Sequence, residues 1–395
     1  MKTQKTKFLR ISSLLAFILI PLGGLTTDIY IPSLPAMAQD LNVPVASIQV
    51  SLLLFMISSG ISQLFIGSIL DSFGRYKINI AALLVFALAS FTIALVPNLY
   101  IIYAMRVVQG ITVSLIIVGK RAFFVDMYTG NALRHYTSLF SIVWAVAPII
   151  APFIGGYLQH IFGWQSNFYL LGILTAMVLF FELRYTGESL KKYQPFNWQI
   201  VINTYKNMLG TADFSLGLLI IGLSYSLLVI YGMASPFIIE KVYGYSPVTT
   251  GYSSLLSGIA LMGGGLLSKI LISKPLYTKL KAAISLQLTA AAAMLIITLH
   301  TDTFIILIGF TIAIHLLSGF IFNNVYAYCL QRFTSHAGTS SGLTGGGIYV
   351  ISSIIGYAII HLFTLDAVQV LASINLYIVT ALSVVIFLFF KKKSN

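Results

Sequence analysis

The chain is poor in charge. Only 8% of its 395 residues are charged and only 10 are acidic, whereas 58% are hydrophobic. Soluble domains average about 25% charged residues, so this composition excludes a protein surrounded by water on all sides. The single cysteine, Cys329, excludes a disulfide framework and a cysteine-based metal site. No GxxxxGK[ST] or HExxH motif is present, which argues against direct use of ATP and against zinc-dependent hydrolysis. We therefore predict neither an enzyme nor a bound cofactor or metal.

Long apolar runs take the place of the missing charge. Runs of about 20 residues are typical of membrane-crossing helices. A longer polar connection, near residues 185–212, separates six runs from six others. The twelve expected spans lie near 10–38, 46–70, 78–96, 99–119, 136–158, 167–184, 213–240, 248–270, 281–299, 304–330, 338–361 and 367–390.

The basic residues indicate how the chain is oriented. The formal net charge is +13, which on its own is also compatible with nucleic-acid binding. When the N-terminus is placed in the cytoplasm, all 23 Lys and Arg except Arg106 and Lys241 fall on the cytoplasmic side. Lys and Arg accumulate in cytoplasmic loops of membrane proteins. We therefore expect a multi-pass protein with both termini in the cytoplasm, a lipid bilayer as its surroundings, and no nucleic-acid partner.

The first apolar run also raises the alternative of a cleaved signal peptide. It has a basic start, and Ala36-Met37-Ala38 looks like a cleavage site. However, Ile11 to Tyr30 is longer than the usual 7–15-residue core of a signal peptide. We expect this run to stay in the protein as the first span.

Three motifs resemble signatures of the major facilitator superfamily. Gly67-Ser-Ile-Leu-Asp71-Ser-Phe-Gly74-Arg75, between spans two and three, resembles its GxxxDxxGR motif. Arg106-Val-Val-Gln109-Gly110 in span four resembles its RxxQG motif. Ala151-Pro152-Phe-Ile-Gly155-Gly156 in span five resembles its GPxxGG motif, with Ala as the first residue. Each match alone is a weak signal, but three matches at the expected places in a twelve-span chain are a strong one.

Shorter segments resemble the Bcr/CflA-type drug:proton antiporter branch of that superfamily. They are Thr27–Pro35, Ser235-Pro236-Phe237 with Tyr243–Pro247, and His336–Ser340. The resemblance implies an all-α membrane protein of twelve transmembrane helices in two six-helix bundles around a central cavity. With the connection described above, the bundles would comprise residues 1–190 and 213–395, joined by a cytoplasmic loop at 191–212.

The resemblance also implies proton-coupled export of small amphipathic molecules by alternating access. The working unit would be a monomer in a bacterial inner membrane, with protons and a small molecule as its partners. A dedicated carrier for one metabolite or siderophore, working in either direction, is the alternative.

Asp28 is the candidate proton carrier. It lies well inside the first span, roughly 9–15 Å below the expected outer boundary. An ionisable group at this depth costs about 2.5–3.5 kcal/mol and usually faces a cavity. Arg106 lies at a similar depth in span four and is its expected partner. The alternatives are a structural role for Asp28 near Pro32 and Pro35, and an Arg106 satisfied by backbone carbonyls.

His315 in span ten is the rival proton carrier. Steps of four, four and three place His315, Gly319, Asn323 and Tyr326 on one helix face. A polar stripe in a membrane helix faces protein or water rather than lipid, and histidine titrates near neutral pH unless its surroundings shift it. A histidine with a purely structural hydrogen bond is the alternative.

Two further groups of residues complete the expected site. A cargo pocket is mainly apolar with a few polar anchors, and the expected lining residues are Tyr30, Gln109, Tyr231, Phe237, Asn323, Asn324 and Tyr326. One gating element is expected at Gly67, Asp71, Gly74 and Arg75, where the glycines would permit close helix approach and the acid would latch one state. A second is a bend in span five at Pro148, Pro152, Gly155 and Gly156. Ordinary packing against lipid or neighbouring helices is the alternative for each.

Overall fold

The computed structural model describes residues 3–193, 198–333 and 337–393. Helices fill most of these ranges, and their only β-interaction is an isolated bridge between Thr3 and Glu188. Eleven helical stretches within the described residues are long and apolar enough to cross a membrane. Helix α7 (Gly130–Phe162) contributes a shorter apolar stretch, Val146–Phe162. The predicted all-α membrane fold is confirmed.

The first apolar segment is broken rather than continuous. It consists of the short helix η1 (Thr6–Phe8), α1 (Leu9–Leu19), α2 (Leu22–Asp28), η2 (Ile31–Ser33) and α3 (Leu34–Asp40). Pro21 follows α1 and Pro32 lies in η2. Proline has no N–H to donate to the preceding turn, so the hydrogen-bond ladder is interrupted at these places. Asp28 is therefore the last residue of α2, directly before the second break.

The remaining helices mostly follow the predicted spans, with longer ends. They are α4 (Val45–Phe73), α5 (Tyr76–Leu95), α6 (Leu99–Met127), α7, α8 (Gln165–Tyr185), α9 (Trp198–Gly210), α10 (Ala212–Phe237) with the π-helical turn η3 (Ile238–Val242), α11 (Pro247–Ile270), α12 (Leu276–Thr298), α13 (Phe304–Arg332), α14 (Ala337–Leu362) and α15 (Val368–Lys393). The predicted connecting segment 191–212 contains α9, which the sequence analysis treated as loop.

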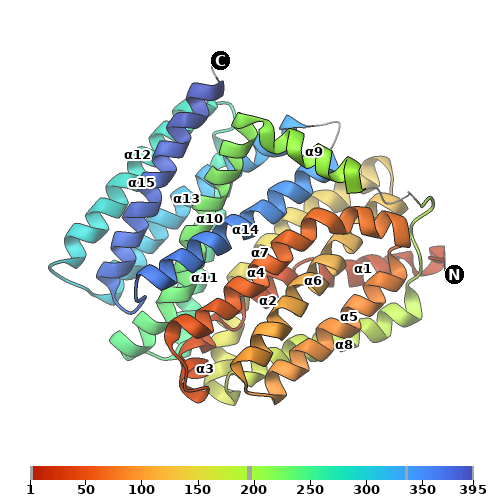
Figure 1. The fold of residues 1–395 in the computed structure, drawn as a ribbon, viewed down its shortest axis with the longest axis horizontal. Coiled ribbons are helices and arrows are strands. Elements are labelled where there is room, and N and C mark those ends of the chain that lie inside the picture. The colour runs from red at the N-terminus through yellow and green to blue at the C-terminus, as the bar shows by residue number, and fades with distance from the viewer. Residues whose placement is uncertain (1–2, 194–197, 334–336, 394–395) are drawn as a thin grey trace.

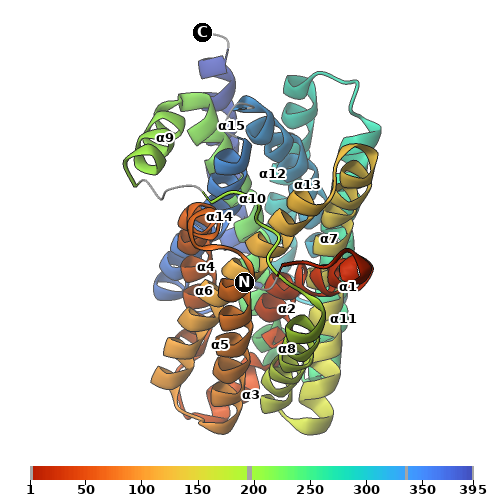
Figure 2. The same cartoon turned by 90° about the vertical axis from the view of Figure 1, so that its right-hand side faces the viewer.

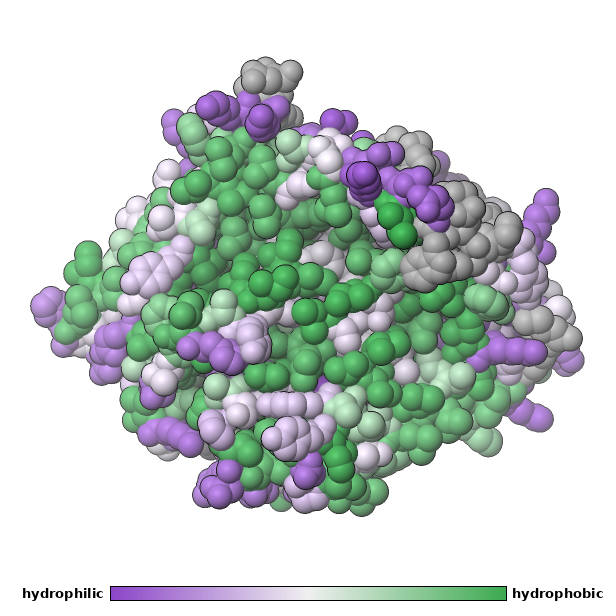
Figure 3. Space-filling model, viewed as in Figure 1, coloured by the Kyte–Doolittle hydropathy of each residue, from purple (hydrophilic) through white to green (hydrophobic). Residues whose placement is uncertain are grey.

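The two ends of the molecule differ. Figures 1 and 2 place α9 and the C-terminus toward one end and α3 at the opposite one. We call these the α9 end, which also carries the α4–α5 connection, and the α3 end, which also carries the α10–α11 connection. The face shown in Figure 3 is mainly hydrophobic over its middle and hydrophilic at its margins, as expected for a surface that contacts lipid.

Glycines bring the first six long segments against the last six. Helix α4 packs on α14, and α7 packs on α11. A Cβ atom on Gly60 of α4 would lie 2.7 Å from the carbonyl oxygen of Gly346 on α14. A Cβ on Gly156 of α7 would lie 2.6 Å from the carbonyl oxygen of Pro247 at the start of α11. Small residues let membrane helices approach this closely without large side chains between them.

Candidate functional site

Asp28 lies at a small cavity between the two groups of helices. The cavity measures about 30 Å³, and its lining combines α2 and α4 with α7, α10 and α11. A water molecule needs about 10–15 Å³ measured in this way, so there is room for about two waters and not for a drug-sized molecule. The Oδ2 atom of Asp28 is buried and has no hydrogen-bond partner. The structure thus shows a small cavity bordered by a half-buried Asp28, one of whose carboxyl oxygens has no hydrogen-bond partner. The cavity is lined by Thr27, Asp28, Ile31, Leu52, Met56, Pro148, Pro152, Tyr225, Leu228, Val229, Tyr231, Gly232, Ser254 and Ser257.

Arg106 lies near Asp28 but does not form a direct ion pair with it. Its guanidinium donates to the carbonyl oxygens of Thr26 at 3.2 Å and Ser51 at 3.4 Å, and to Gln109 Oε1 at 3.0 Å. It also packs over the Tyr30 and Phe55 rings, at 4.5 and 4.3 Å from their centroids. The residue is fully buried, and none of its hydrogen bonds goes to Asp28. The hydrogen bonds of Arg106 thus agree with the alternative in which backbone carbonyls satisfy this residue. The position of Arg106 near Asp28 still allows its charge to influence Asp28.

Tyr30 and Gln109 support Arg106 rather than line the cavity. Tyr30 is fully buried, and its hydroxyl is 3.0 Å from Ser51 Oγ. Gln109 donates from Nε2 to Ser90 Oγ at 2.8 Å. Both residues are therefore held by the first group of helices, and neither is among the residues that line the cavity.

His315 joins three helices of the second group. Its Nδ1 lies 2.7 Å from the hydroxyl of Ser257 on α11. The Tyr231 ring packs edge-on against it at 5.3 Å. Ser257 and Tyr231 both line the cavity that holds Asp28. His315 itself is buried and does not line the cavity, and its Nδ1 is engaged by Ser257.

The other expected anchors lie in several places. Tyr231 lines the cavity and donates to Ser253 at 3.0 Å. Phe237 is buried near the α3 end, below the Lys241 ammonium. Asn323 and Asn324 donate to the backbone carbonyls one turn earlier on their own helix, and Asn323 is exposed. Only Tyr231 of these four residues borders the cavity in this structure.

The predicted gating loop carries a polar network at the α9 end. Arg75 bonds Asp71 at 2.9 Å and also bonds Asp126, at the end of α6. Asp126 in turn accepts from Ser189 at 2.7 Å. The Glu188 carboxylate accepts from the backbone N–H groups of Arg75 and Tyr76 at the start of α5. These bonds tie the loop to the segment that follows α8.

The glycines of this loop serve different purposes. Gly74 ends α4 with φ at 89°, a backbone conformation that favours glycine. A Cβ on Gly67 would meet no atom within 4 Å. The expectation that Gly67 permits close helix approach therefore does not hold in this structure, because no neighbour lies close enough to require it.

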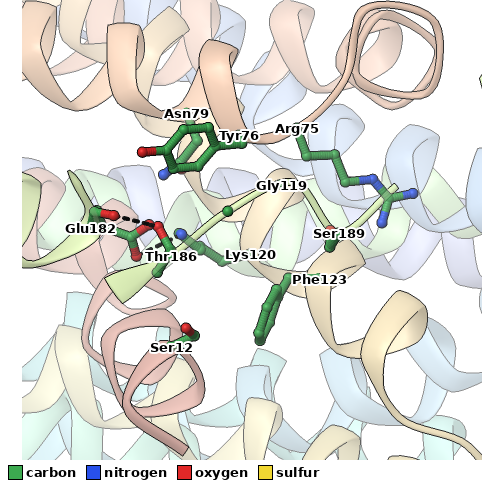
Figure 4. A pocket seen from close by; sticks show the side chains of 11 residues that line it. Ser12, Arg75, Tyr76, Asn79, Gly119, Lys120, Phe123, Glu182, Thr186 and Ser189 are labelled. Carbon is green, nitrogen blue, oxygen red and sulfur yellow. Dashed lines mark hydrogen bonds and ion pairs between the residues drawn. The ribbon is translucent and has the colours of Figure 1, made fainter. Parts of the chain in front are cut away.

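Next to this network, Lys120 and Glu182 form a buried ion pair. Their Nζ and Oε1 atoms are 2.6 Å apart, and Thr186 donates to Glu182 Oε2 at 2.8 Å. Figure 4 shows both contacts beside a cavity of about 20 Å³. The sequence analysis placed Lys120 in a cytoplasmic loop. In the structure α6 continues past residue 119, so Lys120 lies on the helix and is buried.

The proline–glycine segment of α7 borders the cavity and the α3 end. Pro148 and Pro152 both line the cavity, and both lie inside a continuous helix. A Cβ on Gly155 would lie 1.6 Å from the carbonyl oxygen of Ile29, the residue after Asp28. This segment therefore holds the break in the first span against α7.

Sequence reasoning missed Arg121, Tyr225 and Tyr349. Tyr225 lines the cavity, the Tyr349 ring lies 6.1 Å from the Tyr225 ring, and the Nε atom of Arg121 is buried without a hydrogen-bond partner. An available signal was the apolar run Ala122–Val125, which directly follows Arg121 and extends the helix beyond residue 119. The two tyrosines could not be singled out among the 22 of the chain.

Comparisons with known proteins agree with this architecture. The model of the Major Facilitator Superfamily matches residues 16–357. The "uncharacterized MFS-type transporter YdgK" of Bacillus subtilis is 29% identical, covering 85% of this chain and 84% of that protein. The "bicyclomycin resistance protein homolog" of Haemophilus influenzae is 27% identical, covering 96% and 98%. The crystal structure of a bacterial homolog of the human lysosomal transporter Spinster, inward-facing and unoccupied, superposes with a TM-score of 0.73 at 14% identity, covering 98% and 97%.

Proposed function

Because this chain belongs to the Major Facilitator Superfamily and is a membrane transporter rather than an enzyme, we propose that it exports small amphipathic molecules in exchange for protons. The bicyclomycin-resistance relative supports efflux and supports the resemblance to the Bcr/CflA-type branch. We also propose a monomer as the working unit, as is typical of this superfamily, in a bacterial inner membrane with both termini in the cytoplasm.

The buried, unpartnered Oδ2 atom of Asp28 is the observation that carries this proposal. A buried carboxylate oxygen without a hydrogen-bond partner disfavours the ionised form, so closing the cavity around Asp28 and binding a proton favour each other. When the halves open, water reaches the carboxyl group and the nearby Arg106 charge stabilises its ionised form. A proton taken up on one side can thus be released on the other.

Cargo and proton would compete for the same state of the site. A cavity of about 30 Å³ is too small for cargo, so cargo enters only in an open state. In that state, bound cargo would hold Asp28 ionised, and its departure would allow protonation and closure. Each cycle then exchanges cargo for protons, which is alternating access with Asp28 as the shared site.

The test is transport in vesicles that contain the purified full-length chain. A pH gradient is imposed, and uptake of a panel of cationic, neutral and anionic amphipathic compounds is followed. We expect the wild-type protein to accumulate one or more compounds, and Asp28→Asn to equilibrate them without accumulation. Asp302→Asn is the matched control, because Asp302 is an exposed acid at the α3 end whose contact is Gln369.

The outcomes separate the alternatives. Normal gradient-driven accumulation by Asp28→Asn would show that Asp28 is structural, and His315 would then be tested in the same way. Accumulation of one compound alone, lost on substitution of Tyr231 or Asn323 by Ala, would favour a dedicated carrier.

A further inference from the structure

Helix α9 has no part in the transport scheme above. It comprises the 13 residues Trp198–Gly210 and lies at the margin of the molecule, where it contacts α10 and α14 (Figures 1 and 2). It is too short to be one of the helical stretches that cross a membrane. The side chains on its different faces therefore have to indicate what surrounds it.

One side of α9 packs on both halves of the protein. Met208 is only 2% exposed and belongs to the main apolar core. The hydroxyl of Tyr205 donates to the carbonyl oxygen of Leu64 on α4, in the first half. In the second half, α9 contacts α10 and α14. These contacts fix the rotation of α9 about its own axis, so the faces that it turns outward are defined.

A second side of α9 exposes apolar residues. Ile202 and Leu209, seven positions apart, are 50% and 48% exposed. An α-helix turns by about 100° per residue, so both lie on one face, with the exposed Lys206 at its edge. The apolar stem of a lysine lies along such a face while its ammonium stays in water. This pattern is typical of a helix that rests on a membrane surface.

A third side of α9 is polar. Asn203 and Asn207 are exposed, and the exposed Gln199 donates to Asn203. At about 100° per residue, both asparagines point roughly 100–140° away from Ile202 and from Met208. The three sides of α9 thus suit three surroundings, which are the protein, an apolar phase and water. These three surroundings meet where a membrane protein emerges from the bilayer.

The chain around α9 is also basic. From Leu190 to Thr211 the sequence contains Lys191, Lys192 and Lys206 and no acidic residue. All three lysines are exposed. Lysines next to a bilayer attract anionic phospholipid headgroups. The charge therefore favours an anionic bilayer surface as the partner of the outer side of α9.

We propose that α9 lies in the headgroup region of the bilayer, with Ile202 and Leu209 toward the acyl chains and Lys206 at the phosphates of anionic lipids. Interfacial helices bury their apolar face about 5–10 Å deep at the boundary between headgroups and acyl chains. The inner side of α9 bonds Leu64 of one half and packs on α10 and α14 of the other. The lipid surface would thus be attached to both halves at the α9 end. This surface does not depend on the transport function proposed above.

The proposal is tested by fluorescence of the full-length protein in vesicles. Cys329→Ala removes the only cysteine, and single cysteines that carry the environment-sensitive dye NBD then replace Ile202, Leu209, Asn203 or Asn207. The vesicles consist of phosphatidylcholine alone or of equal parts phosphatidylcholine and phosphatidylglycerol, with and without lipid that carries a nitroxide quencher on its acyl chain. We expect the dye at positions 202 and 209 to emit at shorter wavelength and to lose intensity with the nitroxide lipid. At positions 203 and 207 we expect neither change.

The contribution of charge is measured in the same vesicles. Phosphatidylglycerol should increase the quenching at positions 202 and 209, because it attracts the lysines. Lys206→Gln should make this increase smaller. Lys269→Gln is the matched control, because Lys269 is an exposed lysine in the last turn of α11, and it should keep the full increase. Unchanged thermal unfolding of each variant establishes that it is folded.

Each other outcome overturns the proposal. The same emission and quenching at all four dye positions would show that α9 does not lie at an interface. Emission at shorter wavelength at positions 202 and 209 without quenching would show that protein covers this side, from a partner or a second copy. Quenching that phosphatidylglycerol leaves unchanged would reject anionic lipid as the occupant. Because no cargo or gradient is present, failure of the proposed transport function would leave these results unaffected.

Discussion

Gly155 offers a direct test of how the first span is held. Its position on α7 faces the carbonyl oxygen of Ile29, and a Cβ atom there would lie 1.6 Å from that oxygen. Real Cβ atoms essentially never approach another atom within 3.0 Å, so Gly155→Ala requires a displacement of about 1.4 Å. The obstacle is backbone on both sides, so rotation of a side chain cannot relieve it.

The expected cost has two parts. Forcing an extra methyl group into a packed interior typically costs about 1–3 kcal/mol of stability. Ile29 directly follows Asp28, so a shift of this size also moves the carboxyl group relative to the cavity. A misplacement of about 1 Å at a functional group can reduce a rate by roughly a hundredfold. We therefore expect Gly155→Ala to lower both the thermal unfolding temperature and gradient-driven flux.

Gly309→Ala is the matched control. Gly309 lies on α13, and a Cβ added to it would meet no atom within 4 Å. The two proteins would be compared by thermal unfolding in detergent and by flux in vesicles. If Gly155→Ala matches Gly309→Ala in both measurements, the close packing of α7 on Ile29 is not what positions Asp28, and the reasoning fails.

Two other substitutions probe the inside of one half and the contact between halves. Lys120→Met leaves the fully buried Glu182 without its cation and should cost about 3–5 kcal/mol in unfolding measurements. Adding Glu182→Leu should restore most of that loss, and failure to restore it would contradict the pairing argument. Gln49 of α4 donates to the carbonyl oxygen of Met233 on α10 at 2.9 Å, which joins the two halves. Gln49→Met removes this hydrogen bond, which is worth about 0.5–1.5 kcal/mol, and should therefore favour opening at the α3 end. Maleimide labelling of Thr27→Cys in a Cys329→Ala background should then speed up, and an unchanged rate would rule out this contact as a latch.

Hydropathy alone was sufficient to predict most of the fold. The apolar runs are about as long as a bilayer is thick, and each became helical near its predicted position, the first as a series of short helices. The break in the first span was less visible, since hydropathy does not register Pro21 or Pro32 as interruptions. Helix α9 was missed for a related reason. It lies in a polar segment, so a search for membrane spans passes over it.

The candidate site was predicted less completely than the fold. Asp28 could be found because it is an acid well inside an apolar run. The buried position of Lys120 could not, because the span was ended at residue 119 and the next two basic residues were assigned to a loop. Lys120 pairs with Glu182 within its own half, whereas Arg121 forms no ion pair among the described residues. That difference depends on which side of α6 each residue occupies, and on tertiary packing that a single sequence does not specify.

The distribution of ion pairs bears on how the two halves would move. Within the described residues four ion pairs occur, and none joins residues 1–190 to residues 213–395; they are Arg75–Asp71, Arg75–Asp126, Lys120–Glu182 and Arg332–Asp213. The Lys120–Glu182 pair is buried and costly to break, so the first half resists internal change there, whereas Arg332 of the pair in the second half is exposed. Contacts between the halves are mainly glycines and apolar side chains, such as Gly60 against Gly346, and these can be exchanged for similar contacts at lower cost. This arrangement favours the predicted division at 191–212, with the halves rearranging across an interface that, among the described residues, carries no ion pair.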